Sequence, residues 1–449
     1  MPELSTAAAA HASTRAAALH ASVTADPAKT AHGERLGDYL QACEALLIAT
    51  MNGQEAVAAD HAEIEFGLIL YWLDTDFDGT RWGLPPTQIT TAQYNQWKAE
   101  IAGAGIVAWD GTLIGEGMWE TFDPGWAIAG MDYLFVEHGL LKRPTFPTSP
   151  VTVQAKANAT IAIIGDWGTG SWHDGSSSGP ALQVLAEAQK LNADYVIHLG
   201  DVYYVGTEGS FVSPHWEADR FVKLWPFKGN SFALNSNHEM YDAANGFFKT
   251  ALGSNIFSAQ GGTSYFAIAG PGWAVIGLDS GYADTSSMFM AGAINSEQQG
   301  FLAKFRDVPF VVLMSHHNPI STDGTTSSIS PLLGQVTAAN ALGRTPEMWY
   351  WGHIHNGIVY SSSSAIAPTL GRCAGHGAIP FGDGKFLGTQ KTITFYANAP
   401  MENPDPKQAN RVRNGFATLA FNNGSVVETF YDQYGNAPWT NTVALPTAT

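Results

Sequence analysis

Two histidines separated by one residue, His353 and His355, follow an aromatic, strand-like run in the segment YWGHIHNG (350–357). Neutral imidazole is a common metal ligand. Because side chains at positions i and i+2 point to the same face of a strand, a continuing strand would aim both rings into one crevice. The pair therefore predicts ligands for adjacent metal ions.

Other side chains of metal-ligand type share one position in the pattern: each stands at the end of a short apolar segment that predicts a strand. The segments are TIAIIGD (160–166), YVIHLGD (195–201), SFALNSN (231–237), FVVLMSHH (310–317) and MWYWGHIH (348–355), which end in Asp166, Asp201, Asn237, His316 with His317, and His353 with His355. The carboxyl ends of strands in an open α/β sheet share one edge, where ligands bind. We therefore expect these residues to form a single site.

The mixture of carboxylate, imidazole and amide ligands suits iron, zinc or manganese. About seven donors are too many for one catalytic ion with an open position, and they fit two ions that share a bridging carboxylate. The sequence therefore predicts a dinuclear metal centre.

The elements that must position this centre alternate between strand and helix. Helical spacing of apolar residues occurs in PALQVLAEAQKL (180–191), WEADRFVKLW (216–225) and SEQQGFLAKF (296–305), and WAVIGLD (273–279) predicts a further strand. This alternation is typical of a layered α/β domain. After residue 390, TITFYA (392–397) and GFATLAFNNGSVVETFY (415–431) predict antiparallel strands, the latter with a turn at residues 422–424.

The first third of the chain has a different pattern. Residues 33–51, 56–73 and 90–105 show helical spacing, and three prolines between residues 142 and 154 predict a linker. We therefore expect a mainly helical N-terminal region at 1–150, of unknown role, and a catalytic domain at 151–449. Because the region is rich in tryptophan, at positions 72, 82, 97, 109, 119 and 126, we expect it to form a lid or wall over the crevice.

Composition limits the partners. The formal net charge is -18 without a basic run, which argues against a nucleic-acid duplex. No apolar stretch has transmembrane length, and the N-terminus lacks the apolar run of a signal peptide. The sequence favours a cytoplasmic protein without a membrane partner, with a secreted or periplasmic one as the alternative if a signal was removed.

Five ordered blocks resemble those of the calcineurin-like metallophosphoesterases, and within them the purple acid phosphatases. The blocks are GDWG (165–168), GDVYY (200–204), SNHE (236–239), SHH (315–317) and GHIH (352–355). The resemblance implies β-sheets sandwiched by helices. It assigns Asp166, Tyr204 and His355 to the first metal, Asp201 to both metals, and Asn237, His316 and His353 to the second.

Two of these assignments have alternatives in the adjacent residue. Tyr203 would exchange roles with Tyr204 if the strand ended one residue early, and His317 could replace His316 as the ligand. The sequence also departs from the family pattern, because Ser236 and Ser315 stand where glycine is usual.

The resemblance implies hydrolysis of phosphate monoesters of small molecules, with ferric iron plus a divalent ion (iron, zinc or manganese) and a metal-bound hydroxide as nucleophile. His238 is the first candidate to contact the phosphoryl group or protonate the leaving oxygen, with Glu239 orienting it and His317 as the second candidate. A phosphodiesterase using the same site is the alternative within this class. A non-catalytic scaffold is the alternative outside it, which the complete ligand set disfavours.

Overall fold

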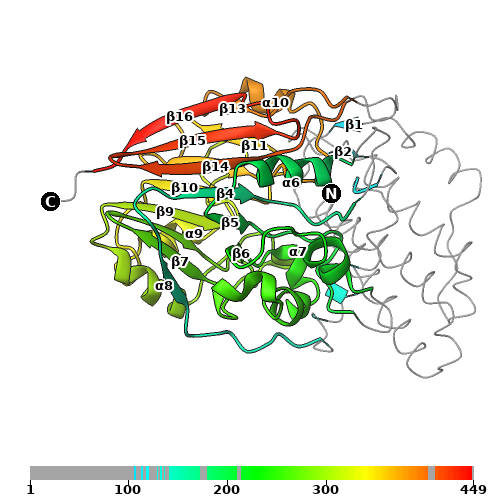
Figure 1. The fold of residues 1–449 in the computed structure, drawn as a ribbon, viewed down its shortest axis with the longest axis horizontal. Helices are drawn as coiled ribbons and strands as arrows, with labels where there is room; N and C mark the ends of the chain where they lie inside the picture. Colours follow the sequence, from blue (N-terminus) through cyan, green and yellow to red (C-terminus); the bar gives the residue numbers. More distant parts are fainter. Residues whose placement is uncertain are drawn as a thin grey trace, which may run out of the picture.

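The structure is a computed structural model, and it describes residues 106–107, 113–114, 118–120, 129, 132–133, 136, 141–171, 179–209, 214–402 and 410–446. The three helices expected between residues 33 and 105 lie outside these residues. In the described part of the chain, two large sheets lie face to face (Figure 1).

The larger sheet has eight strands in the order β13-β11-β12-β10-β9-β8-β7-β3. They are β3 Val151–Gln154, β7 Phe266–Gly270, β8 Trp273–Gly277, β9 Phe310–Ser315, β10 Met348–Trp351, β11 Gly357–Tyr360, β12 Leu370–Ala374 and β13 Ile393–Tyr396. The central strands β8, β9, β10 and β12 are parallel, so their carboxyl ends share one edge.

The second sheet has six strands in the order β16-β15-β14-β4-β5-β6. They are β4 Thr160–Ile164, β5 Tyr195–His198, β6 Ser231–Ala233, β14 Gly415–Asn422, β15 Ser425–Asp432 and β16 Trp439–Ala444. Strands β4, β5 and β6 are parallel, and β14 to β16 are antiparallel. Asn422 pairs with Ser425, which confirms the predicted hairpin turn. Two further short strands, β1 Ile106–Val107 and β2 Leu113–Ile114, pair with each other.

Alternation along the strands explains why the sheets stack. In β4, Ile161 and Ile163 pack into the core between the sheets, whereas Ala162 and Ile164 pack into the core on the outer face. Strands buried on both faces have nearly continuous apolar sequences, as TIAII does. Each sheet therefore needs a second covering layer.

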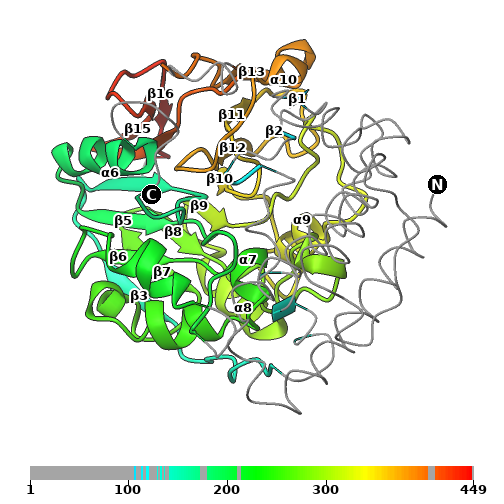
Figure 2. The ribbon, with the colours of Figure 1, turned by 90° about the vertical axis from the view of Figure 1, so that its right-hand side faces the viewer.

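Helices provide that layer. The α-helices are α6 Pro180–Lys190, α7 Asn237–Met240, α8 Ser296–Leu302, α9 Leu332–Thr337 and α10 Lys385–Thr389. Helical segments of other types are η4 Glu217–Val222, η5 Gly246–Ala251, η6 Asn255–Gln260, η7 Ser287–Phe289 and η8 Ala303–Phe305. Helix α6 packs on the outer face of the six-stranded sheet, and α8 and α9 pack on the outer face of the other, as Figure 2 shows.

The layered α/β fold, with sheets sandwiched by helices, is thus confirmed. The six strands predicted between residues 160 and 355 all form. The segment predicted as a helix at 216–225 contains η4, a π-helix. The domain boundary near residue 150 stays a prediction, although β3 begins at Val151. Among the described residues, no helix is long and apolar enough to cross a membrane.

Candidate metal centre

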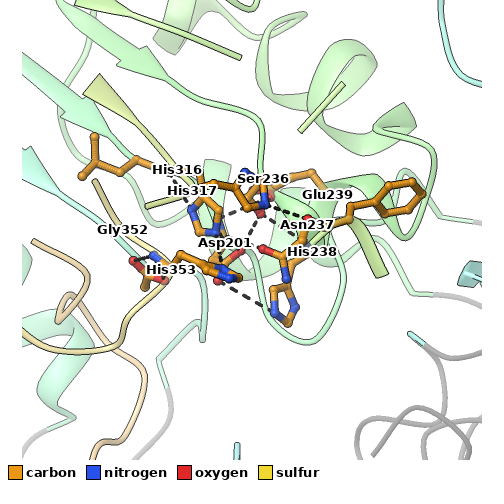
Figure 3. A network of polar contacts seen from close by, with 12 residues as sticks. Asp201, Ser236, Asn237, His238, Glu239, His316, His317, Gly352 and His353 are labelled. Carbon is orange, nitrogen blue, oxygen red and sulfur yellow. Dashed lines mark hydrogen bonds and ion pairs between the residues drawn. The ribbon is translucent and has the colours of Figure 1, made fainter. Parts of the chain in front are cut away.

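The predicted ligands lie in the turns that follow the strands, and three of them have left-handed backbone conformations. The φ angles are 54° at Asp166, 76° at Asp201 and 64° at His353. Such angles cost a non-glycine residue about 1–3 kcal/mol, and they persist where the surrounding structure determines them. Figure 3 shows two of these residues, Asp201 and His353, directed toward the same cluster of side chains.

One group of ligand atoms surrounds the His316 ring. Its Nε2 lies 2.9 Å from Asn237 Oδ1, 3.2 Å from His353 Nδ1 and 3.2 Å from Asp201 Oδ1. His316 Nδ1 donates to the Leu199 carbonyl at 2.9 Å, so Nε2 keeps its lone pair for a cation. These are the four residues that the resemblance assigns to the second metal.

A second group surrounds His355, whose Nε2 lies 3.6 Å from Asp166 Oδ1 and 3.9 Å from Asp201 Oδ2. Both Asp166 oxygens accept hydrogen bonds from the His353 backbone N–H, at 3.0 and 3.1 Å. Asp201 therefore presents one oxygen to each group, which is the position that a bridging carboxylate requires.

The two histidines of the GHIH block reach the site by a different route from the one expected. Strand β10 ends at Trp351, so His353 and His355 do not alternate on a continuing strand, and that prediction was wrong. The left-handed turn at His353 brings both rings to the site instead. Gly352 permits the turn, because a Cβ there would lie 2.5 Å from Asp166 Oδ2.

The structure favours Tyr203 over Tyr204 as the tyrosine of the centre. The Tyr203 hydroxyl lies 2.9 Å from His355 Nε2. The Tyr204 ring instead packs 4.4 Å from Trp119, with the Arg220 guanidinium 5.1 Å from its centroid. Tyr204 stays the ligand predicted from the resemblance, and Tyr203 is the alternative that this geometry favours. Strand β5 ends at His198, three residues before Asp201, where the predicted strand segment ended. The chain therefore turns earlier than expected, and Tyr204 lies in the aromatic layer beside the site.

His317 is occupied by other partners. Its Nε2 donates to the Phe289 carbonyl at 2.7 Å, and its Nδ1 accepts from the Ser280 hydroxyl at 2.8 Å. His317 does lie close to His316 and His353 and forms with them one of two groups that could hold an ion. We favour His316 as the ligand because its Nε2 faces three other donors, whereas both His317 nitrogens are engaged. Because both ring nitrogens have hydrogen-bond partners, the geometry favours His238 over His317 as the proton donor, and the role of His317 stays a prediction.

His238 faces the centre. Its Nδ1 donates to the Tyr204 carbonyl at 2.6 Å, and its Nε2 lies 3.8 Å from Asp201 Oδ2. Glu239 does not orient His238, as had been expected. It accepts from the Asp201 backbone N–H at 3.3 Å and contacts the Ser236 hydroxyl, because α7 turns its side chain away from the imidazole.

Ser236 has a role that the sequence did not indicate. Its hydroxyl lies 2.5 Å from Asp201 Oδ1 and accepts from the His238 backbone N–H at 3.0 Å. Burial and the charge of Asp201 raise the pKa of Glu239 to about 8. The Ser236 hydroxyl thus contacts carboxylate oxygens of both Asp201 and Glu239. The departure from glycine at this position adds a hydrogen bond that orients the central carboxylate.

The donor set fits cations. Asp166 and Asp201 are fully buried, and Asp201 Oδ2 has no hydrogen-bond partner in the described part of the chain. Burial and the adjacent Asp201 charge raise the pKa of Asp166 well above its ordinary range. Burying two neighbouring carboxylates raises the free energy of the folded state unless nearby positive charge compensates their negative charge. Among the described residues, Asp166, Asp201 and His316 form the other cluster, besides that of His316, His317 and His353, whose ligand atoms lie close enough together to hold an ion.

Comparisons with known proteins point to a family for part of the chain. Residues 159–357 match the family model of the calcineurin-like phosphoesterases. A similar solved structure is GAP50, the anchor in the inner membrane complex of Plasmodium, at 12% identity over 65% of this chain and 90% of that one, with a TM-score of 0.44. Another is a dimetal phosphatase from Danio rerio, at 14% identity over 64% and 99%, with a TM-score of 0.38. No curated protein sequence matches the chain. The family match thus identifies a calcineurin-like phosphoesterase domain at residues 159–357.

Proposed function

We propose that the chain hydrolyses phosphate monoesters of small molecules at a two-cation centre like that of the purple acid phosphatases. The observation that carries the proposal is the position of Asp201, with one oxygen 3.2 Å from His316 Nε2 and the other 3.9 Å from His355 Nε2. A carboxylate placed between two groups of donors is suited to bridge two ions.

Asp166, Tyr203 and His355 would hold one cation, Asn237, His316 and His353 the other, and Asp201 both. When bound, the two cations would acidify a water molecule for attack on phosphorus and neutralise negative charge on the phosphoryl oxygens.

The chain's own residues keep this arrangement rigid. Asn237 Nδ2 donates to the Tyr241 hydroxyl at 3.0 Å, which leaves Oδ1 directed at His316. His238 Nδ1 is held by a backbone carbonyl, so Nε2 is directed at the centre, where it can hydrogen-bond the phosphoryl group or the leaving oxygen. Because these side chains are buried, their interactions with a charged substrate are screened less than they would be in water.

We also propose that one of the two ions is ferric, which a tyrosinate ligand would help to select. The support is the Tyr203 hydroxyl at the His355 ring. The second ion is divalent iron, zinc or manganese, because its group contains one amide oxygen, two imidazoles and a shared carboxylate.

The test is metal analysis combined with activity. We expect two metal ions per chain, hydrolysis of para-nitrophenyl phosphate that is lost on chelation and restored by metal, and slower hydrolysis of bis-para-nitrophenyl phosphate. Asp201→Asn should abolish activity, whereas Asp219→Asn, at an exposed position paired with Lys223, serves as the matched control.

Two results would contradict the proposal in different ways. Protein that cannot be reconstituted with metal and hydrolyses neither ester would favour the non-catalytic scaffold. A higher kcat/KM for the diester than for the monoester would favour the phosphodiesterase.

A further inference from the structure

A continuous band of aromatic rings lies along one side of the candidate metal centre. The rings of Tyr203 and His238 stack at 4.1 Å between centroids, and His238 lies 5.0 Å from Tyr241. The band touches the ligands at both ends, since the Tyr203 hydroxyl meets His355 and the Tyr241 hydroxyl accepts from Asn237. These three rings form the inner part of the band.

The outer parts of the band come from residues that precede the matched family domain. Trp119 lies 6.2 Å from the Tyr203 ring, edge to face, and Tyr133 lies 6.0 Å from the Tyr241 ring in the same geometry. Edge-to-face pairs at these separations contribute about 0.5–1.5 kcal/mol each beyond their burial. Trp119 and Tyr133 thus extend the band at both ends.

Each outer ring also has an additional anchor. The Arg220 guanidinium lies 4.9 Å from the Trp119 ring and donates a hydrogen bond to the Tyr203 carbonyl. The Tyr133 hydroxyl accepts from the Met288 backbone N–H at 3.2 Å. Anchors of this kind fix the two rings relative to the ligands.

The band is closed to solvent. Trp119 and Tyr133 are each 6% exposed, Tyr203 is 3% exposed and His238 is 4% exposed, so these faces are not a stacking surface for a large group. Among the described ligand side chains, those of His353 and His355 are partly accessible, whereas the remaining ligands are buried. A substrate must therefore approach along the edge formed by these two histidines.

We infer that Trp119 and Tyr133 are specificity-determining residues that narrow the site to phosphate esters with small leaving groups and exclude phosphorylated peptides. This inference rests on the proposed phosphoesterase function. The family match begins at residue 159, so the inference assigns part of the site to the chain before it. Removing either ring would open the His238 side of the centre without removing a metal ligand.

The experiment compares kcat/KM for a phosphoserine peptide with kcat/KM for para-nitrophenyl phosphate, in the wild type, Trp119→Ala and Tyr133→Ala. We expect the ratio of peptide to aryl phosphate to rise about tenfold or more in each variant, as pocket contacts of this size discriminate by one to two orders of magnitude. The metal content and the inhibition constant of inorganic phosphate should stay within about twofold of the wild type, since neither variant removes a proposed metal ligand or His238.

Trp439→Ala is the matched control, because it removes the same side chain from β16, where Trp439 stacks on Phe395 instead of a site residue. Its ratio should equal that of the wild type. If the alanine variants do not fold, Trp119→Leu and Tyr133→Leu are measured instead, with the same direction expected.

An unchanged ratio in folded, metal-loaded variants would overturn the inference. A wild-type protein that already prefers the phosphoserine peptide would overturn it as well. Absence of hydrolysis of either substrate by the metal-loaded wild type would instead reject the proposed function, so the two failures are distinguishable.

Discussion

Alanine substitution of the adjacent residues His316 and His317 separates a metal ligand from a residue that only supports it. His316 Nε2 lies within 3.2 Å of Asn237, His353 and Asp201, so His316→Ala removes the donor at the middle of one group. His317→Ala removes two hydrogen bonds, to Ser280 and to the Phe289 carbonyl, and leaves every proposed ligand in place.

The magnitudes follow from these contacts. The His317 ring packs 4.9 Å from His316 and 5.0 Å from His353, so its loss should displace these proposed ligands, and we expect the reduction of about 10–100-fold in metal affinity or activity that is typical of an outer-shell residue. It corresponds to about 1.4–2.7 kcal/mol of binding free energy. His316→Ala should exceed about 100-fold, because a coordinating atom itself is lost.

The assay is dialysis against buffered free metal followed by elemental analysis, together with kcat and KM for an aryl phosphate. We expect His316→Ala to retain one ion, held by Asp166, Asp201, Tyr203 and His355, and His317→Ala to bind two with weaker affinity. The thermal unfolding midpoint of each apo-protein controls for folding. If His317→Ala loses an ion and His316→Ala keeps both, the choice of ligand made from the geometry is wrong.

Three further predictions concern other parts of the molecule. The visible charge-transfer band of the iron-loaded protein should disappear in Tyr203→Phe and persist in Tyr204→Phe. The reverse result would identify Tyr204, the residue expected from the sequence spacing, as the ligand. Arg372 donates two hydrogen bonds to the buried Glu428, at 2.7 and 3.0 Å. Arg372→Met should lower the free energy of unfolding, measured in denaturant titrations, by about 3–5 kcal/mol, because it leaves the buried carboxylate without its partner charge. The double variant Arg372→Met with Glu428→Leu should recover most of this loss. Burial lowers the pKa of His376 to about 3, so the unfolded chain binds the extra proton between about pH 6.5 and pH 3. The stabilising contribution of His376 is therefore complete above about pH 6.5. As the pH falls from about 6.5 toward 3, the free energy of unfolding should decrease by roughly 1.4 kcal/mol per pH unit. His376→Gln should reduce this pH dependence relative to the wild type.

Much of the catalytic domain could be predicted from local pattern. Segments such as TIAII are apolar on both faces, and only a strand covered on both sides satisfies that pattern, so β4 and its neighbours were predicted together with the layered fold. The hairpin at residues 422–425 was predicted for a similarly local reason, because Asn423 and Gly424 suit a tight turn.

Local pattern could not decide which member of an adjacent pair enters the site. That choice depends on the backbone angles after each strand, which distant contacts determine. Arg220 holds the Tyr203 carbonyl, and Ser280 engages the His317 ring. None of these partners is adjacent in sequence to the residue that it positions.

The sequence by itself therefore determined the types of ligand, their order and the strands that carry them, because these follow from residue chemistry and short-range periodicity. Only the tertiary structure decided that β10 ends before His353, that Tyr203 meets His355, and that the Trp119 ring packs against Tyr203. Those features depend on contacts between segments far apart in the chain, for which a single sequence contains no periodic signal.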